Sequence, residues 1–213
     1  MNITEKISYC DFAKSKISDD LLKACGKLFS EHYAVRPNGD RVKMGPQTLK
    51  KLFLFNEKCR LVFAQDAEVI IGHAFYVLFE SELGKSIWIT QLIVDKEYRN
   101  RKIAKTLISI ILSHGWEVVG LVSSHPYAIK SLERSTERFV DPEINQRYAE
   151  DIIRSSNVPY LKDAKIYDNV IDTNFDVDHK EINDILNQLN DWKLGTLPDK
   201  FEFIGLIIRI ARF

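Results

Sequence analysis

The stretch that decides the fold of this chain runs from residue 92 to residue 105 and reads Leu92-Ile93-Val94-Asp95-Lys96-Glu97-Tyr98-Arg99-Asn100-Arg101-Lys102-Ile103-Ala104-Lys105. Its apolar beginning predicts the end of a strand, and a short turn leads from there into a helix that begins near Ile103. Four cationic side chains surround the first turn of that helix: Arg99, Arg101, Lys102 and Lys105. Because the amino-terminal end of a helix carries partial positive charge, a cation there typically costs about 0.3–1 kcal/mol.

This unfavourable placement of charge points to an anionic ligand. Unpaired backbone N–H groups project from the same helix end. Cations and free N–H donors together form a site suited to a phosphate or a pyrophosphate. We therefore expect a phosphate-bearing ligand at the start of this helix, and the alternative is a basic helix end that only faces solvent.

The overall composition is that of an ordinary soluble globular protein. The 213 residues include 30 basic and 30 acidic side chains, so the net charge is zero and does not favour nucleic acid or an anionic membrane as a partner. Cys10, Cys25 and Cys59 are odd in number and lack metal-ligand spacing, which predicts reduced thiols and a cytoplasmic protein. The first residues lack the apolar core of a signal peptide, and no apolar run is long enough to span a bilayer.

Hydrophobic periodicity predicts alternating helices and strands around the opening stretch. We predict helices over 19–30, 47–55, 103–114, 126–135, 143–155 and 180–189, and strands over 60–65, 69–79, 86–94, 117–122 and 201–209. The first two strands form a hairpin, and the nearly continuous apolar run over 86–94 is typical of a strand covered on both faces. Residues 158–178 have no regular pattern. This order predicts an α/β protein built as an α+β sandwich.

At Arg99, Lys102 and Ala104 the turn into the helix resembles the signature of the GNAT superfamily of acyl-CoA-dependent N-acyltransferases. That signature reads Arg/Gln-x-x-Gly-x-Gly/Ala and follows the family's fourth strand. Lys102 stands where the family usually has glycine. The segment 123–128 and the tail over 176–203 extend the resemblance to a poorly characterised subgroup with an insertion before its last strands.

The resemblance implies a single domain over 1–213 with an insertion at about 138–191 before the final strand. Its central sheet would be mixed, mostly antiparallel, flanked by helices and splayed between the fourth and fifth strands. The co-substrate would be acetyl-CoA or another acyl-CoA, and no metal is implied. Its pantetheine arm would lie along Leu92, Ile93 and Val94, its pyrophosphate on the N–H groups of Arg99, Asn100, Arg101, Lys102, Ile103 and Ala104, and its other phosphates near Arg101, Lys102 or Lys105.

The activity implied by the resemblance is the transfer of an acetyl group to a primary amine of a small molecule or peptide. The alternative is a sensor or scaffold module that binds acyl-CoA but has little or no catalytic activity. A third hypothesis, nucleic-acid binding through the basic helix end, is disfavoured by the zero net charge and by Asp95 and Glu97 beside the cations.

Many enzymes of this family use a tyrosine on the helix after the fifth strand as the general acid. The corresponding position here is near Leu132 and holds no tyrosine. His125 and Tyr127, at the start of that helix, are the nearest replacements, and the imidazole has the more suitable ordinary pKa. The alternatives are a capping role for His125 and a packing role for Tyr127.

The acceptor site is less well marked in the sequence. Tyr33 and Arg36 lie in the early region that builds acceptor sites in the resembled family, and they are candidate substrate contacts. His73 either faces the cleft or is a hydrogen-bonded core residue. The sequence over 176–179, Asp-Val-Asp-His, is interpreted as a loop before a helix, because a metal site would need further ligands at regular spacing.

Overall fold

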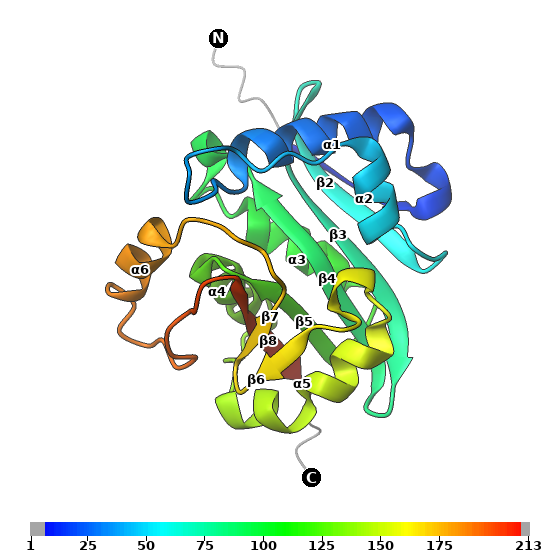
Figure 1. Cartoon of the computed structure of the whole chain (residues 1–213). Coiled ribbons are helices and arrows are strands. Elements are labelled where there is room, and N and C mark those ends of the chain that lie inside the picture. Colours follow the sequence, from blue (N-terminus) through cyan, green and yellow to red (C-terminus); the bar gives the residue numbers. More distant parts are fainter. Residues whose placement is uncertain (1–6, 210–213) are drawn as a thin grey trace.

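The chain folds around one eight-stranded sheet, and the computed structural model describes residues 7–209 (Figure 1). The strands are β1 (Ser8–Ala13), β2 (Cys59–Asp66), β3 (Val69–Ser81), β4 (Gly84–Val94), β5 (Val118–Ser123), β6 (Lys165–Tyr167), β7 (Val170–Asp172) and β8 (Phe201–Ile208). They lie side by side in the order β1-β2-β3-β4-β5-β8-β7-β6. Every neighbouring pair is antiparallel except β4 and β5, which are parallel. The mixed, mostly antiparallel sheet is therefore confirmed.

Helices cover both faces of this sheet. They are α1 (Asp19–His32), α2 (Pro46–Phe53), α3 (Ile103–Leu112), α4 (Pro126–Thr136), α5 (Pro142–Ser156) and α6 (Lys180–Leu186), with 3-10 turns η1 (Lys14–Lys16), η2 (Lys96–Tyr98) and η3 (Pro159–Leu161). In Figure 1, α1, α2 and α5 lie in front of the sheet and α3 and α4 behind it. Among residues 7–209, no helix is long and apolar enough to cross a membrane.

Each face of the sheet has its own apolar core. On one face, Ile103, Leu107 and Ile111 of α3 pack against the sheet, as their predicted helical row requires. On the other face, Trp88 of β4 and Phe75 of β3 pack against α1, α2 and α5. Covering on both faces explains why β4 and β8 have few polar residues.

The parallel pairing of β4 with β5 ends halfway along β4. It joins Ser86–Ile89 to Val118–Leu121, whereas β4 continues to Val94 and β5 to Ser123. A bulge opposite Phe75 and Tyr76 leaves Thr90 as an extra residue on β4. Because a bulge bends its strand, it contributes to the separation of the two strands beyond this point. The splay between the fourth and fifth strands is thus confirmed.

Three strands were not predicted from the sequence. β1 is an edge strand whose residues alternate only weakly between polar and apolar, and the predicted order began with a helix. β6 and β7 are three residues each and lie within 158–178, which was predicted to be irregular. Because β7 pairs with β8, the segment over 138–191, where we expected an insertion, extends the sheet.

Gly120 of β5 lies directly beneath the Trp88 ring, and we expect Gly120→Ala to destabilise the fold. An added Cβ would lie 2.4 Å from Trp88 Cζ3, and the buried indole has no room to move. Overpacking of this kind typically costs about 1–3 kcal/mol. At Gly205 the added Cβ would meet Ile129 Cδ1, the end of a flexible side chain, at 2.6 Å. Urea unfolding should therefore show a larger loss of unfolding free energy for Gly120→Ala than for Gly205→Ala. Equal losses in the two variants would contradict the inference that the Trp88 ring cannot move aside.

Candidate active site

The turn into α3 has an unusual backbone conformation that leaves the helix end open. Lys102, the N-cap residue, has φ 64° and ψ 11°, and Asn100 also has φ 64°. This left-handed region is normally favourable only for glycine, with asparagine as the commonest exception. Lys102, at the position where the family signature has glycine, thus adopts a backbone conformation that glycine favours. No side chain caps α3, so the first N–H groups of the helix keep their capacity to bind an anion.

The cations around this helix end are held in different ways. Arg101, Lys102 and Lys105 are exposed, and the Arg101 guanidinium lies 4.9 Å from the centre of the Tyr98 ring. The Tyr98 hydroxyl donates to Asp66 Oδ2 at 2.8 Å, which anchors this ring to β2. The Arg99 guanidinium lies 3.4 Å from Glu181 Oε1 on α6. The structure therefore gathers the four predicted cations at one end of α3.

The strand that precedes this turn has a free edge. Beyond Ile89, β4 pairs with β3 on one side only. Leu92 and Val94 are half-buried against the α3 side of the sheet, whereas Ile93 is buried towards α1. The Thr90 carbonyl accepts a hydrogen bond of 2.9 Å from the Tyr160 hydroxyl. The free edge, the α3 terminus and the four cations form one continuous region.

His125 lies at the start of α4, near the same region. Its Nδ1 accepts from the Tyr127 N–H at 3.3 Å, so the imidazole caps α4. Its Nε2 is buried, has no hydrogen-bond partner among residues 7–209, and lies 4.0 Å from Glu181 Oε1. Burial, followed by the positive charge of Arg99, lowers the pKa of His125 to about 4. The ring is therefore neutral at pH 7, with its proton on Nε2 because Nδ1 is an acceptor.

The other predicted catalytic positions differ in exposure. The Tyr127 side chain is 43% exposed on the first turn of α4, and its ring centroid lies 5.6 Å from that of His125. Leu132, at the position where the family often has its tyrosine, is fully buried in the core between α4 and the sheet.

The predicted acceptor residues do not form one cluster. His73 is fully buried, its Nε2 lies 2.8 Å from Gln91 Oε1, and burial lowers its pKa to about 4. Arg36 is exposed in the turn between α1 and α2. Tyr33 is half-buried, stacks on Phe29 at 4.6 Å between ring centroids and contacts Phe175 of the insertion. His73, through Gln91 of β4, and Tyr33, through Phe175, thus lie near the splay, whereas Arg36 faces solvent.

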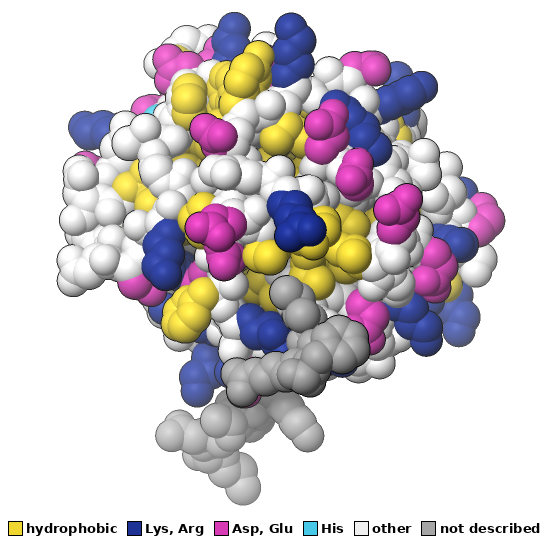
Figure 2. Space-filling view, turned by 90° about the horizontal axis from the view of Figure 1, so that it is seen from below, with side chains coloured by type: hydrophobic (Ala, Val, Ile, Leu, Met, Phe, Trp, Pro, Cys, Tyr) yellow, Lys and Arg dark blue, Asp and Glu magenta, His cyan; other side chains and the backbone are white. Residues whose placement is uncertain are grey.

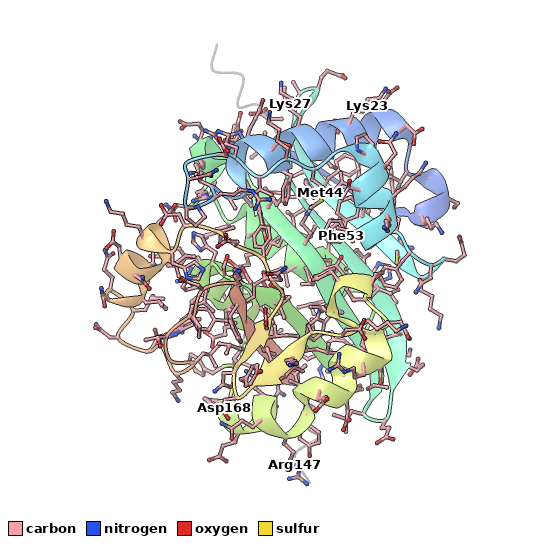
Figure 3. The ribbon with its side chains drawn as sticks, viewed as in Figure 1. Lys23, Lys27, Met44, Phe53, Arg147 and Asp168 are labelled. Carbon is pink, nitrogen blue, oxygen red and sulfur yellow. The ribbon has the colours of Figure 1, made fainter. Side chains whose placement is uncertain are left out.

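A shallow groove lies between α1 and the loop that leads into α2. Its walls are formed by α1 and the start of α2, and it is lined by Lys23, Gly26, Lys27, Ser30, Lys43, Met44, Gly45 and Pro46. In Figure 3, Lys23 and Lys27 project outwards from α1, whereas Met44 lies deeper, towards the sheet. The Met44 sulfur lies 3.9 Å from Gln91 Nε2 on β4.

The insertion brings further groups to the splay. Its segment 173–179 leaves β7 and rises towards α1 before it enters α6 (Figure 1). Phe175 contacts Tyr33, Val177 packs in a small core with Leu28 and Ile93, and the Asp178 N–H donates to the Val35 carbonyl at 2.8 Å. The segment therefore spans from one side of the splay to the other.

Sequence reasoning missed Glu202 of β8. This side chain is 5% exposed, and burial raises its pKa to about 7 although Thr173 and the Ser124 backbone hydrogen-bond to the carboxylate. The signal was present, because Glu202 interrupts the otherwise apolar strand at residues 201–208. A carboxylate at a buried position of a central strand needs an explanation.

Two further features, possible metal ligands and the distribution of surface charge, do not define the site further. In the part of the chain that the structure describes, no three His, Cys, Asp or Glu side chains gather as metal ligands would. Figure 2 shows basic and acidic side chains interspersed around an apolar patch on the face seen from below. That face has no continuous basic surface of the kind that nucleic-acid binding requires.

Comparison with known proteins identifies the family. The model of the acetyltransferase (GNAT) family matches residues 27–134, which include the splayed strands and the α3 terminus. The chain therefore belongs to the acetyltransferase (GNAT) family. A search among curated proteins found no match.

Several solved structures are similar to this chain. An aminoglycoside acetyltransferase from an uncultured soil metagenomic sample, in complex with trehalose, is 18% identical with a TM-score of 0.46, over 63% of this chain and 90% of that one. The diaminobutyrate acetyltransferase EctA from Paenibacillus lautus, with its substrate and coenzyme A, is 18% identical with a TM-score of 0.40, over 61% and 72%. Arabidopsis thaliana NAA60, with a bisubstrate analogue, is 19% identical with a TM-score of 0.44, over 60% and 82%. The chain is placed in the family by its match to the family model, and not by its similarity to these structures.

Proposed function

We propose that this protein transfers an acetyl group from acetyl-CoA to a primary amine of a small molecule or peptide. The observation that carries the proposal is the open end of α3, where a left-handed turn, uncapped N–H groups and four cations adjoin the free edge of β4. N–H groups of residues 100–104 would bind the pyrophosphate, and Arg101, Lys102 or Lys105 would bind the remaining phosphates. The expected contact from the Arg99 N–H is not part of this proposal, because that group donates to the Lys96 carbonyl at 3.3 Å. The backbone along Leu92, Ile93 and Val94 would pair with the pantetheine arm.

Isothermal titration of the purified protein with acetyl-CoA tests this proposal. We expect micromolar affinity that becomes weaker with 3′-dephospho-CoA, because a phosphate that contacts cations contributes to binding. Titration with desulfo-CoA tests whether the sulfur atom of the co-substrate contributes to the affinity. Absence of binding to acetyl-CoA would contradict the proposal and the sensor alternative together.

For the chemical step, we propose supporting roles for His125 and Tyr127. The neutral His125 ring holds its proton on a buried nitrogen that has no hydrogen-bond partner among residues 7–209 and lies 4.0 Å from Glu181 Oε1, the oxygen that Arg99 approaches. That N–H can donate a hydrogen bond to the bound co-substrate or to the leaving sulfur. Tyr127 also lies in the first turn of α4, and its side chain would line the co-substrate site beside His125. Tyr33, Arg36 and His73 remain proposed acceptor contacts, with His73 acting from behind Gln91.

We expect His125→Ala to slow turnover more than it weakens acetyl-CoA binding. Loss of a single donor near the reacting atoms typically lowers kcat by about 10²-fold, whereas the phosphate contacts at α3 stay in place. Steady-state kinetics and titration with acetyl-CoA measure the two effects separately. His125→Asn keeps a short side chain that can cap α4 and serves as the matched control for helix capping. An unchanged kcat in His125→Ala would make His125 a purely structural cap.

The second candidate function is a sensor or scaffold module that binds acyl-CoA without transferring the acyl group. The observation that favours it is the buried Leu132 at the position where the family often carries its tyrosine acid. Binding of acetyl-CoA without any release of CoA in the presence of varied amines would support this candidate. For either function we propose a cytoplasmic location, since Cys10, Cys25 and Cys59 are all free thiols.

A further inference from the structure

Glu202 occupies an energetically unfavourable position. It lies on β8 next to Phe203, which pairs with Ser123 at the end of β5, and it is 5% exposed. Among residues 7–209, no other Asp or Glu residue is buried to this degree. Among residues 7–209, the groups that lower the pKa of Glu202 against the effect of burial are the Thr173 side chain and the Ser124 backbone, and neither is a cation. A buried carboxylate without a cation costs stability, so its retention calls for a function.

The surroundings of Glu202 come from three separate parts of the chain. Tyr33 follows α1, Tyr160 lies in η3 of the insertion, and Thr173 follows β7. Ile171 of β7 pairs with Glu202 and shares an apolar core with Tyr160, and Phe175, which follows β7, contacts Tyr33. Burial raises the pKa of both tyrosines, and the negative charge of Glu202 raises it further. Both tyrosines stay protonated at neutral pH and can donate hydrogen bonds.

Tyr160 connects this cluster to the splay between β4 and β5. Its hydroxyl donates to the carbonyl of Thr90, the bulged residue at which β4 leaves β5. Thr90 Oγ1 is buried without a partner among residues 7–209. Glu202, beside the end of β5, and Thr90, on β4, therefore border the same opening from its two sides.

We propose that Glu202 is the general base of the transfer reaction and that the ammonium group of the acceptor binds beside it, near the rings of Tyr33, Tyr160 and Phe175. This inference rests on the proposed function. Aromatic faces and a carboxylate together favour a cation, so the acceptor is an amine that arrives in its protonated form. The insertion, which supplies Tyr160, Thr173 and Phe175, then forms part of the acceptor site.

In the reaction, the Glu202 carboxylate takes one proton from the acceptor ammonium, directly or through one water molecule. The freed amine nitrogen forms a bond to the thioester carbonyl carbon. The carbon–sulfur bond then breaks, and the second nitrogen proton goes to the leaving thiolate. The products are the acetylated amine and CoA, and Glu202 returns its proton to solvent. Burial suits this role, because it brings the pKa of Glu202 to about 7.

Glu202→Gln tests the proposal with little risk to the fold. Because the folded-state pKa of Glu202 is raised, its ionised form destabilises the fold at pH values above the ordinary pKa of 4.5, and a neutral amide removes that cost. Glu82→Gln makes the same chemical change in the exposed turn between β3 and β4 and is the matched control. The probes are acetyl-CoA with n-butylamine, 2-phenylethylamine and glycinamide, and CoA release is measured by chromatography across pH.

We expect Glu202→Gln to bind acetyl-CoA as the unaltered protein does but to lose about 100-fold or more in kcat, the usual contribution of a general base. In the unaltered protein and in Glu82→Gln, kcat should rise with pH through an apparent pKa near 7, and this rise should be absent in Glu202→Gln. An unchanged kcat and pH profile in Glu202→Gln would overturn the inference while leaving the proposed function intact. Failure of the unaltered protein to bind acetyl-CoA would instead refute the proposed function.

If none of the three amines is acetylated, infrared difference spectra still decide the question. The carboxyl band that is lost in Glu202→Gln should titrate near pH 7 in the complex with acetyl-CoA. Titration near the ordinary glutamate pKa of 4.5 would overturn the inference, because the carboxylate would then be too weak a base for this role.

Discussion

We expect Arg99→Glu to weaken acetyl-CoA binding by about 100-fold or more in isothermal titration. A hydrogen bond from a charged donor contributes about 1.5–3 kcal/mol, and each 1.4 kcal/mol corresponds to about tenfold in affinity. The substitution also places a carboxylate where the phosphates are expected, so repulsion adds to the lost contact. Because the N–H groups of α3 remain in place, binding should be weakened rather than abolished.

A matched control separates this local effect from the change in net charge. Arg147 is exposed on α5, and Figure 3 shows it projecting at the lower end of the molecule. Arg147→Glu makes the same chemical change, and its affinity for acetyl-CoA should equal that of the unaltered protein. If Arg99→Glu also binds normally, the phosphates do not contact Arg99, and the proposed orientation of the co-substrate is wrong.

The second large effect concerns stability. We expect Asp11→Ala to lower the free energy of unfolding by about 2–4 kcal/mol, which is slightly less than the loss caused by breaking a fully buried ion pair. The Asp11 carboxylate on β1 accepts from Arg60 Nη2 at 3.0 Å, from the Tyr76 hydroxyl at 2.8 Å and lies 2.8 Å from His114 Nε2. These partners lie on β2, on β3 and just after α3. The substitution leaves the guanidinium and the phenol without their shared acceptor in a half-buried site.

The pH dependence of this effect has a definite sign. Burial raises the pKa of Asp11, but hydrogen bonds from Arg60, His114 and Tyr76 outweigh burial and hold it below 3.8. A group whose pKa is lowered in the folded state stabilises the fold above its ordinary pKa, and this contribution is lost as the pH falls through the folded-state pKa. Urea unfolding should therefore show a large difference between Asp11→Ala and the unaltered protein at pH 7 and a smaller one in strong acid.

Asp20→Ala provides the control for this stability experiment. Asp20 forms an exposed ion pair with Lys23 within α1, and such pairs contribute little. Its unfolding midpoint should match that of the unaltered protein. If Asp11→Ala also leaves the unfolding midpoint unchanged, the contacts of Asp11 with Arg60, Tyr76 and His114 do not contribute to stability.

Some of the candidate site could be predicted because its information is local. Between residues 92 and 105, an apolar strand end, a turn and a cationic helix start follow one another, and the structure places them in that order. The left-handed conformation at Lys102 could not be predicted from its residue type, because lysine rarely adopts it. The position in the signature, where the family has glycine, was the better guide.

Other assignments depended on contacts between distant segments. The sequence left open whether His125 is a proton donor or a helix cap, and the structure shows its Nδ1 committed to capping α4. β1 and the β6–β7 hairpin escaped prediction because strands of three to six residues have too few alternating positions to show a pattern.

The sequence by itself determined the class of fold, the open helix end and the family resemblance, because periodicity and motif spacing depend on neighbours along the chain. Only the tertiary structure decided that Glu202, Tyr33 and Tyr160 lie together. β8 inserts between β5 and β7 although it follows both in the chain, and this topology brings residues more than 160 positions apart to one place. Their proximity results from strand pairing and from burial in the shared core, and no local pattern records it.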